Sequence, residues 1–349
     1  MFVCLSAGRS PRYREDILRA LAMPMGCSLQ FRYDQKWVAQ IIRDRLPAGI
    51  AKGQKVLIAY IDQEDKSKIP EIVPCRFATL GEVVPHGSTV SLELIVGQYA
   101  YAADLGTFDR EMSSASANTL PRYQSDGSIK GAYWLELDRD LTTVSSTLSL
   151  ADWERIVSQL APHHQFEGEK CFYAVTGPHE LGKKESVEIK EGIYALRSDK
   201  EYEIQVYHFH PNKTPSGVTL SIRVPTSLAT IVSGASLVVD SRYDLKRTRF
   251  TTARLANAER GNITVTRTEA STTEARSVDF DMLIEVAGTL WATLLQGAIA
   301  GMLLAAPQVV AALQNPNIPT PNRQTIMIAA GVFGLLTGVF AAFALKKPV

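Results

Sequence analysis

Hydrophobic residues recur at helical spacing in three parts of the chain. They occupy one face of segments 13–22, 35–46 and 149–160, so each segment is predicted to form an amphipathic helix that packs against a core. Ser10 and Pro11 supply a start signal for the first of these helices, because proline suits the first helical position.

Short apolar runs bounded by turn residues predict β-strands between and after these helices. β-branched and aromatic residues are frequent in the runs, as expected where side chains pack on a pleated surface. The first three runs predict a small β-barrel or sheet, and the spacing of the later ones favours an all-β sandwich. The predicted strands cover residues 55–61, 72–78, 89–96, 170–176, 202–209, 218–224, 236–239 and 262–267.

Together these elements predict an α+β fold class. A β-rich cytosolic body, consisting of a small barrel or sheet and a β-sandwich-like domain, is expected to precede a C-terminal two-helix transmembrane hairpin. Segments rich in small polar residues separate the parts. The expected organisation is an N-terminal α+β domain at 1–103, a loop or linker at 104–131, a β-rich domain at 132–268, a connector at 269–282 and the transmembrane hairpin at 283–348.

The hairpin is predicted from two runs without any charged side chain, 286–313 and 325–345. Each run is longer than the roughly 20 residues that a helix needs to cross a bilayer. Three prolines in 314–323 favour a turn outside the membrane. The positive-inside rule places both termini in the cytoplasm, because Lys residues 346–347 outnumber Arg323 of the turn. A buried pair of core helices is the alternative.

Both predicted membrane helices carry features that favour helix–helix contact. Polar side chains on one face of the first helix would either hydrogen-bond to neighbouring helices or line water, and glycines at GxxxG spacing let helix backbones approach closely. A pore would require an oligomer, because two helices enclose no channel. The residues are Thr289, Thr293 and Gln296 on the polar face, and Gly297, Gly301, Gly334 and Gly338 at the close-packing positions.

Charged residues are distributed unevenly along the chain. The formal net charge of +1 argues against binding of nucleic acid or anionic lipid over the whole surface. Residues 1–60, however, hold ten Lys and Arg against four Asp and Glu. This excess would orient an anionic ligand; a solvated surface, with docking between the two halves of the chain, is the alternative.

Two basic clusters are candidates for binding phosphate groups, because clustered guanidinium groups recognise phosphate in bidentate fashion. The second cluster is interleaved with Tyr243 and Phe250, which would stack on a base. A solvated face for the first, or an edge strand protected by charge for the second, is the competing interpretation. The first cluster is Arg9, Arg12, Arg14 and Arg19, and the second is Arg242, Lys246, Arg247 and Arg249.

Catalytic and metal motifs are weak in this sequence. The four cysteines form no C-x-x-C pair, and no secretory leader is recognised, so a reduced compartment is expected. Segment 177–184 fits a phosphate-binding loop only in part, because Lys184 replaces the Ser or Thr that such a loop needs. His208 and His210 share a strand face without a metal-ligand pattern around them. No enzyme activity, cofactor or metal is therefore expected.

The layout of a large body followed by two apolar runs, 286–313 and 325–345, looks like the two-helix membrane effectors of bacterial anti-phage defence. This resemblance is one of architecture. It implies a cytosolic sensor for a nucleotide or oligonucleotide signal, a homo-oligomer, and an ion-conducting pore in the bacterial inner membrane. A cytosolic protein is a further candidate partner.

Two alternatives remain open beside this interpretation. The chain would instead be a binding or scaffold protein tethered by a non-conducting anchor, or a membrane-associated enzyme that acts on nucleotides or nucleic acid.

Overall fold

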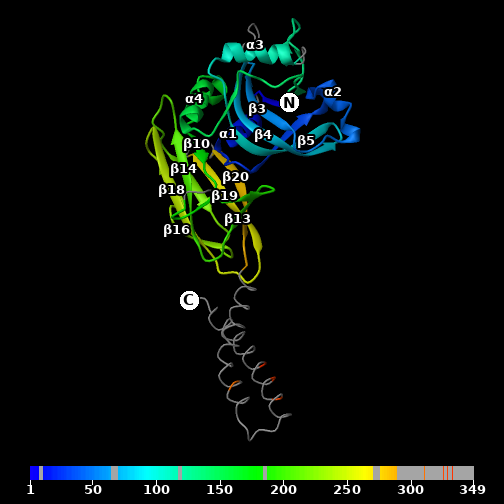
Figure 1. Cartoon of the computed structure of the whole chain (residues 1–349). Helices are drawn as coiled ribbons and strands as arrows, with labels where there is room; N and C mark the ends of the chain where they lie inside the picture. Colours follow the sequence, from blue (N-terminus) through cyan, green and yellow to red (C-terminus); the bar gives the residue numbers. More distant parts are fainter. Residues whose placement is uncertain are drawn as a thin grey trace.

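The computed structural model describes residues 1–7, 11–63, 70–116, 120–183, 187–269 and 276–288, together with positions 310, 325, 328 and 332. These residues form a β-rich α+β body built from several sheets (Figure 1).

The first sheet is curved like half of a barrel (Figure 1). β3 and the first half of β4 are buried continuously, which indicates that both faces of the sheet are covered there, whereas the second half of β4 is more exposed. β1 pairs in parallel with β3 and antiparallel with β8, whereas β3, β4 and β5 form an antiparallel meander. The strand order is β2 (Ser28–Asp34), β5 (Thr89–Tyr101), β4 (Glu71–His86), β3 (Lys55–Asp62), β1 (Phe2–Ser6) and β8 (Trp134–Glu136), and β9 (Ser145–Thr147) also pairs with β5.

Two further sheets make up the second half of the described chain. Their facing sides pack on each other, since the ring of Tyr173 stacks on that of Phe280 with centroids 6.5 Å apart. One sheet has the order β10 (Phe172–Val175), β14 (Glu201–Phe209), β18 (Tyr243–Thr252), β16 (Ala229–Ser233), with β11 (His179–Glu180) on β14. The other has the order β12 (Ile189–Lys190), β13 (Ile193–Leu196), β20 (Arg276–Val286), β19 (Glu259–Glu269), β15 (Val218–Arg223), β17 (Ser236–Val239).

Two helices hold the halves together. α1 (Pro11–Ala22) contacts β2 and β4 of the first sheet and also β10 and β20. α4 (Leu150–Leu160) packs on β4 and β5, while the ring of Trp153 meets Tyr207 of β14 edge-to-face. Both helices lie where the sequence pattern predicts them. The remaining elements are α2 (Gln40–Arg43), α3 (Leu105–Ala115), α5 (His164–Glu167), short 3-10 turns at Gln35–Trp37 and Leu46–Ala48, and the hairpin of β6 (Arg122–Tyr123) and β7 (Ile129–Lys130).

Three expectations from the sequence need correction. The expected loop at 104–131 contains α3, whose polar composition hides an apolar face that is buried on the first sheet. The expected connector at 269–282 contains most of β20, which lies inside a sheet because it pairs with β19 and β13. The single helix expected over 35–46 is divided into a 3-10 turn, α2 and a second turn.

The transmembrane hairpin expected at 283–348 lies almost entirely outside the described residues. Its first four positions belong to β20, which ends at Val286. Within the part of the chain that the structure describes, no helix has the length and apolar composition needed to span a membrane. Thr289, Thr293, Gln296, Gly297, Gly301, Gly334 and Gly338 all lie outside that part.

Candidate functional site

A pocket opens at the carboxyl end of β1, beside the start of α1. At this strand the sheet changes from parallel pairing with β3 to antiparallel pairing with β8. In open sheets of α/β proteins, ligands bind outside the carboxyl ends of parallel strands where the strand order changes direction. The pocket occupies the corresponding place in this mixed sheet.

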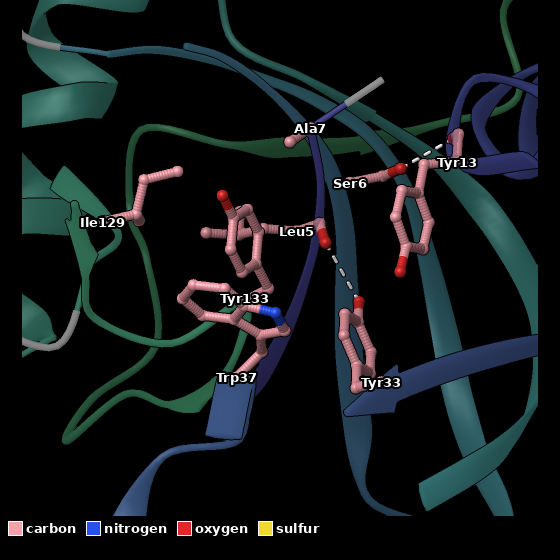
Figure 2. Close-up of a pocket in the computed structure, with 8 residues that line it drawn as sticks. All are labelled: Leu5, Ser6, Ala7, Tyr13, Tyr33, Trp37, Ile129 and Tyr133. Atoms are coloured by element: carbon pink, nitrogen blue, oxygen red, sulfur yellow. Dashed lines mark hydrogen bonds between the residues drawn. The ribbon is translucent and has the colours of Figure 1, made fainter. Parts of the chain in front are cut away.

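Aromatic side chains dominate the lining of this pocket, which is named the aromatic pocket below. Figure 2 shows Trp37 and Tyr133 together on one side of the end of β1, with Tyr13 and Tyr33 on the other side. The cavity measures about 140 Å³. Pockets that enclose a whole drug-sized ligand measure roughly 300 Å³ or more, so this one has room for a ring but not for a larger molecule. The other lining residues are Leu5, Ser6, Ala7 and Ile129.

Hydrogen bonds and ring contacts fix these walls. The Tyr33 hydroxyl donates to the carbonyl oxygen of Leu5 at 3.0 Å, and Ser6 Oγ donates to the carbonyl oxygen of Tyr13 at 2.6 Å (Figure 2). The rings of Trp37 and Tyr133 meet edge-to-face with centroids 5.4 Å apart. Burial raises the pKa of Tyr33 well above its usual value, so this phenol stays protonated. The pocket is therefore preformed and uncharged inside.

A cation lies beside this apolar interior. Lys36 Nζ lies 5.1 Å from the centre of the Trp37 ring, and its side chain is exposed. Lys36 forms no ion pair within the described ranges. Arg12 of α1 lies elsewhere, because it lines a separate hollow together with Asp16 and Asp279. An unpaired cation beside the pocket and the start of a helix favour an anionic group there.

The first predicted basic cluster does not converge on one point. Arg9 lies outside the described residues, and Arg14 Nε lies 3.2 Å from the buried carboxylate of Glu169. Arg19 donates to the backbone oxygen of Asp279 at 2.9 Å and forms ion pairs with the acids of its own helix, Glu15 and Asp16. Arg12 lines a hollow beside Asp16 and Asp279, so acidic side chains lie near it as well.

The second predicted cluster lies on and beside β18, where acidic side chains neutralise most of it. Arg247 and Arg249 both pair with Glu203 on the neighbouring strand, at 3.6 and 3.1 Å. Arg242 donates to the backbone oxygens of His210 and Pro211, and Lys246 lies between Asp240 and Asp244. Phe250 is fully buried and stacks on Tyr202, whereas Tyr243 is exposed. A base could stack on Tyr243 but not on Phe250.

The histidines have structural partners. His208 Nε2 lies 3.1 Å from the backbone oxygen of Ser241, and His210 Nε2 lies 3.1 Å from that of Glu169. Burial lowers the pKa of both imidazoles. The described residues contain no group of three His, Cys, Asp or Glu side chains arranged to hold a metal ion.

The described part of the sequence motif, 177–183, consists of a short strand and a turn. His179–Glu180 forms β11, and Gly182 has a φ of +83°, which places it in a turn. A strand and a turn do not provide the helix N-terminus on which a phosphate-binding loop depends.

Sequence reasoning missed the aromatic pocket. The pattern of 35–46 places Trp37 on the core face of a predicted helix, and no motif distinguishes Tyr33 or Tyr133. The convergence of these aromatic residues depends on β8, which pairs with β1 from more than 100 positions away.

The sequence matches no protein-family model, and no curated protein emerges as a relative.

Proposed function

We propose that this chain is a sensor that binds a nucleotide or oligonucleotide signal in the aromatic pocket and acts at a membrane through its C-terminal segment. The observation that carries the proposal is a small aromatic pocket with the exposed ammonium of Lys36 beside its Trp37 wall. The membrane part of the proposal comes from the two uncharged runs, 286–313 and 325–345, which are long enough to span a bilayer as a helical hairpin behind a sandwich-like second half.

The chemistry of the pocket favours a base rather than an aliphatic ligand. A flat ring gains stacking and edge contacts with Trp37 and Tyr133, and base–aromatic stacking is worth about 1–3 kcal/mol per base. The pocket has room for the ring alone, so sugar and phosphate would remain outside. There the phosphate meets Lys36 and the start of α1.

α1 offers a route from the pocket to the C-terminal segment. The helix begins beside the pocket, and its Arg19 donates to the backbone of Asp279 on β20 at 2.9 Å. β20 continues to Val286. At Gly288 the chain passes so close to the backbone of Asn257 that a Cβ would lie 2.4 Å from its carbonyl carbon, so the body also contacts the chain just after β20. In this proposal, ligand binding shifts α1 and thereby β20, and the C-terminal segment responds by assembling into an oligomer, with an ion-conducting pore as the output.

Calorimetric titration of the purified full chain with nucleoside 5′-monophosphates and a short single-stranded RNA tests the binding step. Trp37→Ala is expected to weaken binding by about tenfold or more, because the stacking contact is lost. Lys36→Gln is expected to weaken binding of the phosphate-bearing ligand but not binding of the corresponding nucleoside, because only the phosphate contacts the lost charge.

Tyr243→Ala is the matched control, because it removes an exposed aromatic residue from the other basic cluster. Its affinity should equal that of the unmodified protein. Unchanged binding in Trp37→Ala together with weakened binding in Tyr243→Ala would reject the aromatic pocket and direct attention to β18.

A further inference from the structure

A second and larger cavity lies at the junction of the first sheet with the two other sheets. It measures about 420 Å³, within the range of pockets that enclose a small ligand. Its walls come from β4 and β5 on one side and from β10, β13, β14 and β18 on the other. Most of the lining is apolar or aromatic, and it includes Tyr99, Ala174, Tyr194 and Tyr207. Ligand pockets occur preferentially at such junctions.

Arg76 of β4 is the feature of this cavity that calls for an explanation. Its residue is 1% exposed, yet its side chain lines the cavity. Nε donates to the backbone oxygen of Gly97 at 2.8 Å, and Nη1 donates to that of Ala20 at 3.3 Å. The guanidinium carries five N–H donors, so most of its donors have no protein acceptor in the part of the chain that is described. It also lies 4.0 Å from the centre of the Tyr99 ring.

No carboxylate balances this buried charge. Among the described residues Arg76 forms no ion pair, and no other residue lining the cavity has a charged side chain. Tyr194 does not supply a negative charge either, because its hydroxyl donates to the backbone oxygen of Met25 and burial raises its pKa. Burying an unpaired charge is costly, and partial pairing with backbone carbonyls does not remove its net charge.

Arg267, also buried among the described residues, provides a comparison, because carboxylates balance its charge. Arg267 of β19 is equally buried, but its guanidinium lies 2.7 Å from Glu169 and 3.2 Å from Glu269. Arg267 therefore has its counter-ions within the protein. The guanidinium of Arg76 instead contacts the face of the Tyr99 ring, two backbone carbonyl oxygens and the cavity.

We propose that this cavity binds a small organic monoanion, a carboxylate with an apolar or aromatic body. The single guanidinium presents a planar fork that matches one carboxylate, and the apolar walls accept the remainder of the molecule. A nucleoside di- or triphosphate fits this site poorly, because a single cation faces several negative charges. The site is independent of the aromatic pocket and extends the function proposed above.

Binding here would join the two halves of the body. The carboxylate is held from β4 of the first sheet, whereas the apolar body contacts strands of both other sheets. A ligand that bridges elements in this way stabilises the folded chain by mass action.

The test is calorimetric titration of the purified full chain with 1-naphthoate and with decanoate, each compared with its uncharged alcohol, 1-naphthylmethanol or decanol. We expect the carboxylates to bind more tightly than the alcohols. Arg76→Gln should weaken carboxylate binding by about tenfold or more, since charge-assisted hydrogen bonds are lost, and should leave the alcohols unaffected. Arg76→Lys should retain part of the preference, because it keeps the charge.

A second variant keeps the proposal testable if Arg76→Gln fails to fold. Ala174→Leu adds carbon atoms to the cavity wall without changing charge, and it should weaken carboxylate and alcohol alike. Trp37→Ala should leave carboxylate binding unchanged, which separates this site from the aromatic pocket. Equal affinity for carboxylate and alcohol in the unmodified protein, or no binding of either carboxylate, would overturn the proposal.

Discussion

Asp109 of α3 is half-buried, and its Oδ1 accepts a hydrogen bond from the backbone N–H of Ile72 at 3.2 Å. Burial is the largest influence on this carboxyl and raises its pKa from 3.8 to about 7, while Glu71 adds a smaller repulsion in the same direction. The folded state therefore prefers protonated Asp109, whereas the unfolded chain ionises it near 3.8.

The sign of the pH effect follows from this difference. Below pH 3.8 Asp109 is protonated in both states, so it does not lower the free energy of unfolding. Between pH 3.8 and about 7 the free energy of unfolding falls as pH rises, because the carboxyl ionises more easily in the unfolded chain. Asp109→Asn keeps an Oδ1 acceptor for Ile72 but cannot ionise. Urea unfolding at pH 4.5 and 7.5 should show a smaller loss of stability for Asp109→Asn than for the unmodified protein.

Asp138→Asn serves as the control for this measurement, because the side chain of Asp138 is 60% exposed. Its loss of stability between the two pH values should match that of the unmodified protein. If Asp109→Asn also behaves like the unmodified protein, the half-buried carboxyl does not govern stability in this range.

The sequence identifies some individual charged residues as unusual more readily than others. Arg76 stands inside an apolar strand segment, and that position alone could have marked it as an unusual buried charge. Arg247 and Arg249 instead stand out through clustering, although both pair with the single carboxylate of Glu203 on the adjacent strand. A cluster of like charges in sequence says little, because the opposing charges come from other elements.

Among the elements, α3 shows how a polar segment forms part of the core. Its sequence between Leu105 and Ala115 is mostly polar, yet Phe108, Met112 and Ala115 share a buried face at helical spacing. Asp104 caps the helix by accepting from the backbone N–H of Gly106 at 3.0 Å. The short apolar stripe and the cap stabilise a helix in a segment whose polar composition predicts a loop.

Phe108→Ala tests whether α3 is an integral part of the fold. Phe108 is fully buried, so its truncation should lower the free energy of unfolding by about 3–5 kcal/mol. Arg110→Ala, on the exposed face of the same helix, should change it by no more than about 0.5 kcal/mol. Chemical denaturation of both variants gives the comparison; equal small effects would mean that α3 is only loosely attached.

β20 is a strand in a segment that the sequence predicts to be a connector. It follows polar residues and precedes the apolar run that begins near Val286, so the sequence indicated a connector. In the structure it is an interior strand, antiparallel to β19 and parallel to β13. The segment that leads to the C-terminal part of the chain is therefore held along its whole length by the body.

For the molecule as a whole, this connection makes the proposed output testable. The full chain in detergent is expected to form a defined oligomer by light scattering and to conduct ions in liposomes. Exchange of residues 289–348 for an unrelated membrane anchor should preserve nucleotide binding and abolish conduction. Gln296→Leu should lower ion flux if the polar face lines water.

A monomer that stays silent with every nucleotide tested would reject the pore. It would leave the C-terminal segment as an anchor for a binding module. Conduction that survives the exchange of anchors would reject the proposed role of residues 289–348.

Elements whose side-chain pattern is local can be predicted from the order of residues alone. α1, α4 and β14 follow from spacing along the chain, because a helix or strand that buries one face repeats its apolar residues at a fixed period. β3 and β10 follow from continuous short apolar runs, which are typical of strands buried on both faces. The β-rich α+β class follows from the same patterns.

Contacts between groups that are distant in sequence depend on how the chain folds. Arg76 takes its hydrogen-bond acceptors from residues 21 and 56 positions away, and Tyr133 reaches Trp37 only because β8 pairs with β1. Burial and pairing depend on such partners, and no local period records them. The two cavities, and the charges left unpaired beside them, therefore became visible only in the folded chain.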